Sequence, residues 1–498
     1  MLASPAPQRF VPRPPAAVLA IVTTIVATAS CGSKTPPPAS SATELRIGVG
    51  QAATVVGQGG LHEIENNLSI ESLFSFAGDD GRPRPALAES WTVSPDGQSV
   101  TITLRPNVAF HDGEPLRADA VAGILRSSLT TMGPARADVD SIEARGPREI
   151  VVRFNTPSPF LLEALEAPIE KPDKPGVGTG PYRASPPGSG TMVANTQYYA
   201  GRPSVDTVRV STYPSVRAAW ADLLRDRIDM LYEVGVDALD SLTSDRNVAV
   251  FTFTRRYQYV MLLNTERRAL APPAVRRALN LAIDRDALIQ TALNGHGVAS
   301  SGPVWPRHWA VRSETTKAVT DPMAASVLIA KAGGARFTCL VPSDALYERL
   351  ALEIKRQLSL VGVDLIVRQA SMNDVVGALS SRDFDAVLVE VVSGPTLFRP
   401  YQVWHSNGSR NVLGLSTPTR DRALDRVRHA ANEAEYRDAV AAFQGVVADD
   451  PPAIFLVWSQ RARAVSRRFD VPAEPGRDVL ATLRLWKPST DARAARRN

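Results

Sequence analysis

The alternation of strand-like and helix-like segments is the feature that most limits how this chain can fold. Residues 205–210 have the pattern of a strand. Residues 215–225 then place apolar side chains at helical spacing, and residues 228–231 are again strand-like. A strand, a helix and a second strand in this order form a parallel α/β unit. We therefore expect an α/β fold.

The same alternation continues toward the C-terminus. We expect further helices at residues 274–293, 347–360, 373–379, 423–429 and 435–447, and further strands at 257–264, 363–367, 384–392 and 453–458. Nearer the N-terminus, residues 67–76 have a helical pattern, and residues 91–104 form two alternating runs around Pro95, Asp96 and Gly97, which predicts a hairpin. A chain of 498 residues is too long for one ordinary core, so we expect two or three lobes.

The N-terminal residues have the pattern of an export signal. Arg9 and Arg13 precede an apolar run at residues 16–27, and small residues follow up to Cys31. A cysteine directly after small residues resembles the bacterial lipobox, although Thr28 stands where that signal usually has leucine. The resemblance implies that residues 1–30 are a lipoprotein signal peptide and that Cys31 carries the lipid. A plain cleaved signal with an incidental cysteine is the alternative.

The terminal segments and the net charge of the mature chain restrict the classes of molecule that it is expected to bind. Residues 31–43 are small, polar and rich in proline, which predicts a flexible tether, and the basic residues 491–498 predict a disordered tail. Without Arg9 and Arg13, 54 basic residues stand against 51 acidic ones, too balanced to indicate nucleic acid as a partner. No later apolar run has the length of a membrane span, so any transport pore would be a different chain.

Motifs of catalysis and metal binding are almost absent. The sequence has no Cys-x-x-Cys, His-Glu-x-x-His or Gly-x-Ser-x-Gly motif and no phosphate-binding loop. Its six histidines are scattered, and no two of them have the helical spacing of a metal site. Cys339 lies in an apolar stretch and is expected to be a small core residue. We therefore expect no catalytic residue, no metal site and no cofactor, and a protein that is not an enzyme.

One stretch resembles a known family. Residues 87–121 read LAESWTVSPDGQSVTITLRPNVAFHDGEPLRADAV. This stretch is similar to the signature of the family 5 extracellular solute-binding proteins, the dipeptide-, oligopeptide- and nickel-binding components of ABC importers. Residues 178–182, 199–203 and 275–285 match later segments of the family, in the family's order.

The resemblance implies an α/β fold like that of type II periplasmic binding proteins. Two main α/β lobes would be joined by a hinge, and a smaller α+β lobe would be inserted. Lobe I would combine residues 44–62, 178–256 and 462–490, lobe II would be the insertion at 63–177, and lobe III would be 257–461. The hinge would lie where the chain crosses between lobes, near residues 255–257 and 458–461.

The resemblance also implies that a ligand binds between lobes I and III. Four segments would face it: the loop after the first strand, the residues after Asp229, the hinge strand, and the loop after Val392. The candidate ligand-binding residues on these segments are Gln51, Thr54, Tyr232, Glu233, Arg256, Tyr257, Glu390, Ser393 and Gly394. Ordinary packing between lobes is the alternative for each of them.

The last of these segments departs from the family pattern. Peptide-binding relatives carry an aspartate there that pairs with the α-ammonium group of the peptide, whereas this chain has Gly394 and no acidic residue from 391 to 406. A buried ammonium group without a counter-charge costs several kcal/mol. Glu390 either replaces that aspartate or faces solvent at a sheet edge. The hypothesis is that a free N-terminal amine is not recognised in the usual way.

The expected function is that of an extracytoplasmic solute-binding lipoprotein, anchored to the cell membrane by its lipid. It would capture a peptide or peptide-like ligand, act as a monomer, and deliver the ligand to the permease and ATPase subunits of an ABC importer. A nickel-type metal chelate or another non-peptide solute is the alternative ligand, with His308 and His405 as candidate metal ligands. Two further functions fit the same fold: that of a sensor or interaction lipoprotein, and that of an enzyme.

Overall fold

The computed structural model divides into two units, Met1–Ser41 and Ala42–Asn498. It describes residues 43–50, 59–76, 80–129, 138–158, 162–163, 165–312, 318–411, 414, 416–474 and 476–490, all in the second unit. The expected signal peptide, Cys31, most of the tether and the tail at 491–498 lie outside the described residues, as do Gln51 and Thr54.

Within the described residues, a mixed sheet of 11 strands extends through much of the fold. Two long antiparallel strands, β12 (Val248–Leu263) and β17 (Ala453–Ser466), lie side by side in its middle. On the β17 side follow β11 (Met230–Leu231), β1 (Glu44–Gly50), β10 (Thr207–Tyr213), β9 (Thr191–Ala194) and β8 (Tyr182–Ala184). On the β12 side follow β16 (Ala386–Val392), β14 (Ala335–Pro342) and β15 (Val363–Ala370), and β13 (Val298–Ala299) pairs with β17.

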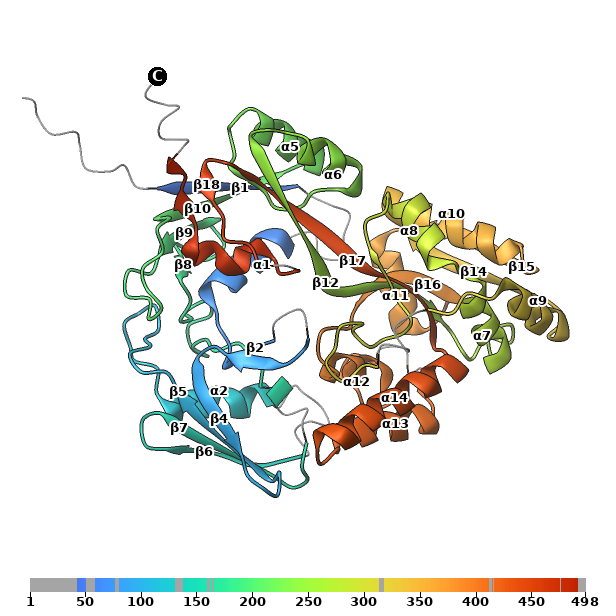
Figure 1. Cartoon of the computed structure of the whole chain (residues 1–498), viewed down its shortest axis with the longest axis horizontal. Coiled ribbons are helices and arrows are strands. Elements are labelled where there is room, and N and C mark those ends of the chain that lie inside the picture. Colours follow the sequence, from blue (N-terminus) through green and yellow to red (C-terminus); the bar gives the residue numbers. More distant parts are fainter. Residues whose placement is uncertain are drawn as a thin grey trace, which may run out of the picture. The chain divides into compact units, whose positions relative to one another are not determined.

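The first group of strands contains the α/β unit expected from the sequence. Strand β1 pairs in parallel with both β10 and β11, and helix α5 (Val216–Leu224) connects these two. Helix α1 (Gly59–Ser69) and the 3-10 helix η2 (Val479–Leu485) lie beside these strands (Figure 1), and α6 (Val236–Thr243) leads into β12. Leu45, Ile47 and Trp486 are fully buried in the core that these elements share. This α/β unit confirms the prediction from residues 205–231.

The second group of strands is built in the same way. Strand β14 pairs in parallel with β15 and β16, and α10 (Ala345–Ser359) and α11 (Met372–Ser381) make the connections. The remaining helices here are α7 (Pro273–Ala282), α8 (Arg285–Leu293), α9 (Pro322–Lys331), α12 (Phe398–Trp404), α13 (Pro418–Arg428) and α14 (Glu433–Asp449). The single helix expected at 274–293 is therefore wrong. The chain turns at Ile283, and the carboxylate of Asp284 accepts a hydrogen bond from Ala287 N, which starts α8 anew.

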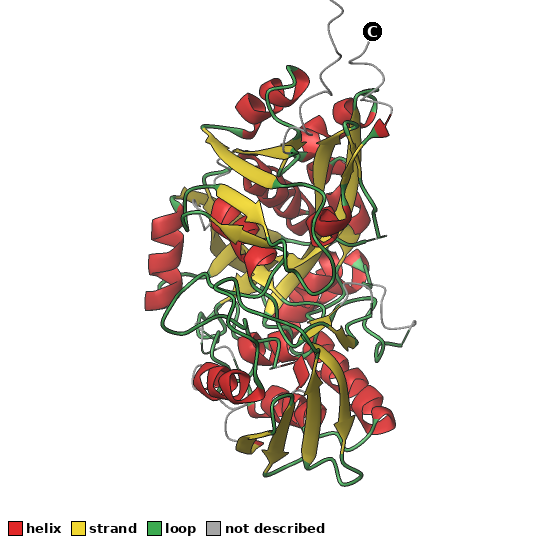
Figure 2. Cartoon of the chain, turned by 90° about the vertical axis from the view of Figure 1, so that its left-hand side faces the viewer, coloured by secondary structure: helices red, strands yellow, loops and turns green. Residues whose placement is uncertain are grey.

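A separate antiparallel sheet is formed by β4 (Ala88–Val93), β5 (Ser99–Leu104), β7 (Glu149–Phe154) and β6 (Val139–Arg145), in that order. Its strands lie side by side in the lower part of Figure 2, and α2 (Ala118–Leu129) packs on them through Val121 and Leu125. The predicted hairpin is confirmed, with Gly97 at a φ of 68° in its turn.

Two short strand pairs complete the described fold. Strand β2 (Phe74–Phe76) pairs with β3 (Pro83–Pro85), and β18 (Phe469–Asp470) pairs with β19 (Lys487–Pro488). The helix expected at 67–76 is wrong beyond Ser69, where α1 ends. Phe74 and Phe76 both enter the core of the small sheet, which the period of two along a strand allows and helical spacing does not.

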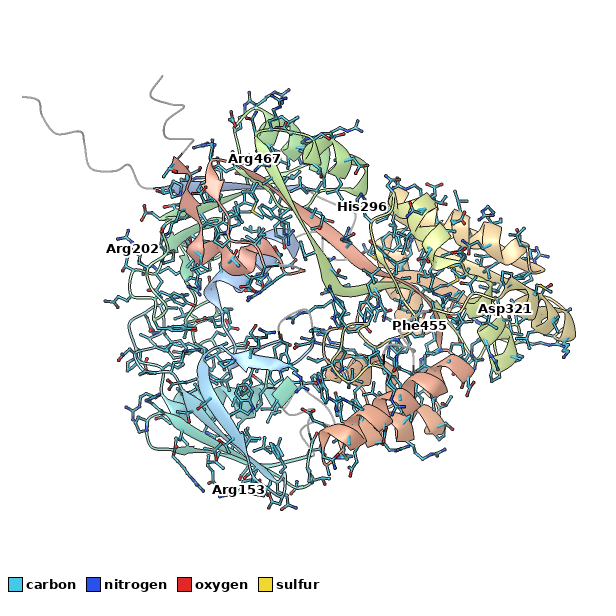
Figure 3. All side chains as sticks on the ribbon, viewed as in Figure 1. Arg153, Arg202, His296, Asp321, Phe455 and Arg467 are labelled. Atoms are coloured by element: carbon cyan, nitrogen blue, oxygen red, sulfur yellow. The ribbon has the colours of Figure 1, made fainter. Side chains whose placement is uncertain are left out.

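The register between β12 and β17 shifts at two places, and the larger of the two shifts lies before Gln258. Thr254 pairs with Gln460, but the next pair is Gln258 with Trp458, so three residues of β12 lie opposite one residue of β17. The three are residues 255–257, the position where the sequence predicts the hinge. Strand β17 runs from near Phe455 to near Arg467, both labelled in Figure 3, and thus passes from the second group of strands to the first.

Candidate functional site

The break in the β12–β17 ladder gathers charged side chains from segments that are far apart in the sequence. Arg255 and Arg256 lie on the three-residue bulge, and Arg461 lies on the facing strand. Four more residues join them from the segment after β11, from β16, from α12 and from the segment after β7. We define the hinge cluster as Arg255, Arg256, Arg399, Arg461, Glu166, Glu233 and Glu390.

Arg461 joins the two groups of strands. Its Nη1 lies 3.0 Å from Glu233 Oε1, and its Nη2 lies 3.3 Å from Glu390 Oε1. Burial would lower the pKa of Arg461, but the neighbouring Tyr259, Glu233 and Glu390 outweigh burial and raise the pKa above the ordinary value. Because Glu233 follows β11 and Glu390 lies on β16, this guanidinium is an ionic link across the predicted hinge.

Glu390 has two partners. Besides Arg461, its Oε2 lies 3.5 Å from Arg255 Nη1, and its side chain is 11% exposed. Strand β16 pairs with β12 at this position, where Glu390 lies opposite Tyr259, and its pairing with β14 covers Ala386 and Val387. The low exposure of Glu390 and its two arginine partners show that the side chain does not face solvent. The alternative in which Glu390 faces solvent at a sheet edge is therefore wrong.

Arg256 and Arg399 share a single carboxylate, that of Glu166. Arg256 Nη1 donates to Glu166 Oε1 at 2.7 Å and its Nη2 donates to the carbonyl of Phe76 at 3.0 Å. Arg399 Nη2 lies 3.6 Å from Glu166 Oε2. Burial, the main cause, and the positive charges of Arg410 and Arg256 together hold the pKa of Arg399 below its ordinary value, although Glu166 opposes them.

Ser393 and Gly394 are buried in the packing behind the hinge. The Ser393 hydroxyl donates to the carbonyl of Pro303 at 2.7 Å and accepts from Gln258 Nε2 at 2.8 Å. A Cβ built on Gly394 would lie 2.7 Å from the ring of Trp305. Trp305 packs edge-on against Trp458, with ring centroids 4.9 Å apart. The position where the resemblance implies an aspartate in peptide-binding relatives is thus crowded by a tryptophan.

The other predicted residues differ in exposure. Tyr257 is exposed, and the Arg255 guanidinium lies 4.4 Å from its ring centroid. Tyr232 is buried, with the guanidinium of Arg463 stacked 3.7 Å from its ring centroid. The structure therefore brings Glu233, Arg256, Tyr257 and Glu390 to the hinge, whereas Tyr232, Ser393 and Gly394 are used in packing.

Sequence reasoning missed four members of the cluster. Arg255 and Arg461 lie in the two segments expected to cross at the hinge, and their charge was the available signal. Glu166 and Arg399 gave no such signal, because Glu166 meets Arg256 only through a contact that spans 90 residues of sequence.

The two candidate metal ligands are both buried in the protein. His308 is buried, and burial lowers its pKa to about 3. His405 Nε2 lies 3.3 Å from Asp425 Oδ1, and its ring stacks on Tyr401. Across the described parts of the chain, no three His, Cys, Asp or Glu side chains form a group that could hold a metal ion. In the same residues, no helix has the length and apolar character needed to cross a membrane.

Comparison with known proteins identifies the family. Residues 82–411 match the bacterial extracellular solute-binding proteins, family 5 (middle region), which is more than half of the chain. The chain belongs to this family. Family 5 proteins are extracellular solute-binding proteins, so the expected family, which is not a family of enzymes, is confirmed.

Individual relatives are distant but cover most of the chain. The oligopeptide-binding protein AppA of Bacillus subtilis is 23% identical over an alignment of 455 residues that covers 80% of this chain and 83% of AppA. The structure of that AppA with a nonapeptide matches with a TM-score of 0.73 at 19% identity, covering 90% of this chain and all of AppA. NikZ of Campylobacter jejuni, in complex with Ni(L-His), matches with a TM-score of 0.75 at 21% identity, over 89% of this chain and 99% of NikZ. These likenesses confirm the expected fold class.

Proposed function

We propose that this family 5 protein is the solute-binding component of an ABC importer and captures a peptide or peptide-like ligand. The observation that carries the proposal is the crossing of β12 and β17, with the hinge cluster placed at it. Two α/β groups that are joined by two strands, here β12 and β17, can change the angle between them. A solute held between the groups is enclosed when they close. The likeness to AppA, which binds oligopeptides, supports the peptide class.

The proposed lobes follow the boundaries expected from the sequence. Lobe I combines residues 44–62, 178–256 and 462–490, lobe II is 63–177, and lobe III is 257–461. The cores support this division in outline, because one cluster contains Leu45 and Trp486 together, a second contains Ile102 and Val152, and others lie within the α/β group around β14. At the boundary near residue 62 they differ from it, because Ile64 and Leu68 of α1 pack in the core of lobe I. The ligand is held between lobes I and III, near Glu233, Arg256, Tyr257 and Glu390.

The proposed location is outside the cytoplasmic membrane, with a lipid on Cys31 as the anchor. The apolar run followed by small residues and a cysteine supports this, and residues 31–43 give the tether that separates the binding lobes from the bilayer. Delivery then requires a separate permease and ATPase.

The test is to identify what the protein retains. Mature protein purified from its own host is analysed by native mass spectrometry before and after denaturation. A released species with peptide bonds, which rebinds to the emptied protein and raises its melting temperature, supports the function. The function is contradicted if the protein is empty and neither host extract nor defined tri- to pentapeptide pools raise its melting temperature.

A further inference from the structure

The hinge cluster carries more positive than negative charge. It has four guanidinium groups against three carboxylates. Each of the three carboxylates is already engaged: Glu166 by Arg256 and Arg399, Glu233 by Arg461, and Glu390 by Arg255 and Arg461. A ligand ammonium group arriving here would have to displace a guanidinium from one of them.

No space remains for an acidic side chain at Gly394 itself, in the loop after β16. A side chain at Gly394 would meet the ring of Trp305. Glu390, the nearest acid in the sequence, lies between Arg255 and Arg461. Because a buried ammonium group without a counter-charge costs several kcal/mol, the described part of the hinge does not suit a cationic end of a ligand.

Arg256 and Arg399 instead have donors to spare. Each guanidinium has five N–H donors. Arg256 uses donors on Glu166 and on the carbonyl of Phe76, and its side chain is 39% exposed. Among the described residues, Arg399 contacts a carboxylate at Glu166, at 3.6 Å and beyond ordinary hydrogen-bond length, and its side chain is 26% exposed. Two partly exposed guanidinium groups sharing one carboxylate leave positive charge that an anion can neutralise.

We propose that Arg256 and Arg399 form the receptor for a carboxylate of the ligand, and that the hinge binds no free amine. This inference rests on the proposed function and names the class of its ligand: a peptide-like acid whose amine is blocked or absent. A carboxylate matches the planar fork of a guanidinium through two parallel hydrogen bonds. Tyr257, exposed beside Arg255, offers an apolar face next to this receptor.

The test compares four pools of tetrapeptides that have the same composition and differ only at their ends. One pool has both ends free, one is N-acetylated, one is C-amidated, and one is blocked at both ends. Calorimetry on the mature protein is expected to give dissociation constants within threefold for free and acetylated pools, and at least tenfold weaker binding after amidation. Weakening of at least tenfold on acetylation, or unchanged binding on amidation, overturns the inference.

Substitutions at Arg256 and Arg399 test whether these two residues form the carboxylate receptor. Arg399→Gln and Arg256→Gln should weaken binding of the free-carboxylate pools at least tenfold and leave binding of the amidated pools unchanged. Arg336→Gln is the control, because this arginine is exposed and pairs with Asp364 on β14 and β15. Arg399→Lys keeps the positive charge but lacks the planar guanidinium group, so it should weaken binding of the free-carboxylate pools less than Arg399→Gln does. Melting curves verify that each variant is folded, and the wild-type comparison of pools stands even if one variant is not.

The outcomes separate the two proposals. If all four pools bind equally well, the peptide-binding function stands and the carboxylate receptor is overturned. If none of the pools binds to wild-type protein, the peptide function is overturned, and with it the inference that rests on it.

Discussion

At the scale of single residues, two buried positions explain why this chain departs from the pattern of its peptide-binding relatives. Gly394 has no room for a side chain because Trp305 and Trp458 pack against it. The guanidinium group of Arg461 forms ion pairs with both Glu233 and Glu390. Position 394 therefore has no acidic side chain, and the carboxylates of Glu233 and Glu390 are already paired. Both features leave the predicted hinge without a free negative charge at these residues.

Introducing an aspartate at position 394 should not create a binding site for the amine of a peptide. Gly394→Asp inserts a side chain against Trp305 and buries a carboxylate without a partner, so we expect a loss of about 2–4 kcal/mol in the free energy of unfolding. Gly394→Ala is the matched control and should lose about 1–3 kcal/mol, since it adds volume without charge. Chemical denaturation measures both. A stable Gly394→Asp protein that binds free-amine peptides more tightly than wild type would contradict this expectation.

A second residue-scale prediction concerns pH. Glu163 is buried and accepts hydrogen bonds from Phe398 N at 2.7 Å and from the Tyr436 hydroxyl at 3.5 Å. Burial raises its pKa from 4.5 to about 8 although these bonds oppose the shift, and the nearby charge of Glu166 raises it further. Between these values the folded protein holds a proton that the unfolded chain has released. The stability that Glu163 contributes through this proton is fully present at pH values below the pKa of the unfolded chain, and it is lost as the pH rises through the pKa of the folded protein.

The expected result is that wild-type stability falls as the pH rises from about 5 to 8, by up to about 1 kcal/mol per pH unit from this group. Glu163→Gln should remove that part of the slope, because the amide cannot titrate. Glu114→Gln is the control, since this exposed glutamate lies on the surface beside Lys171. Urea unfolding at three pH values gives the comparison, and equal slopes for wild type and Glu163→Gln would contradict the assignment.

At the scale of elements, helix ends and strand lengths show what the sequence could reveal. The α/β units, the hairpin at Gly97 and helices α5, α10, α11, α13 and α14 followed from periodicity, whereas α6, α9 and α12 were not expected. Strand β17 was expected to end at residue 458, yet it continues to Ser466. Its second half alternates arginine and alanine, which indicates a solvated segment, but Arg461 and Arg463 are buried with acidic partners. Partners supplied by distant segments cannot be inferred from the strand itself.

The division of the expected helix at 274–293 gives an element-scale prediction. Asp284→Ala removes the carboxylate that accepts from Ala287 N at 2.9 Å, so α8 should lose its N-cap and the protein about 1 kcal/mol of stability. Asp286→Ala, in the first turn of the same helix, should lose only about 0.3–0.5 kcal/mol through the helix dipole. Thermal unfolding of both variants measures the difference. Equal losses would contradict a capping role for Asp284.

At the scale of the whole molecule, the family and the fold class could be predicted because one signature stretch carries them. The sequence also places a chain crossing at residues 255–257, and the ladder is interrupted at these residues. The composition of the hinge cluster was not predictable. Glu166 and Arg399 lie far from the crossing in sequence, and their approach to Arg256 depends on contacts between parts of the fold that periodicity does not describe.

Attachment to the membrane is a prediction for the whole molecule as well. Cys31→Ala should move the protein from the membrane fraction to the soluble fraction, because the acyl chains on the cysteine supply the anchor. Ser33→Ala, two residues further on, is the control and should stay at the membrane. Fractionation followed by intact-mass measurement decides the matter. Wild-type protein without acyl mass would contradict lipidation and favour a plain cleaved signal.

The interrupted ladder between β12 and β17 also determines how the molecule can move. Residues 248–254 pair with β17 in a continuous register, whereas the pairing is interrupted at residues 255–257 and shifts again after Tyr259, so the backbone hydrogen bonds between the two strands are fewest in this short segment. A change in angle between the two groups of strands would therefore alter a few dihedral angles in this segment and the ionic link through Arg461, while the rest of each strand keeps its pairing.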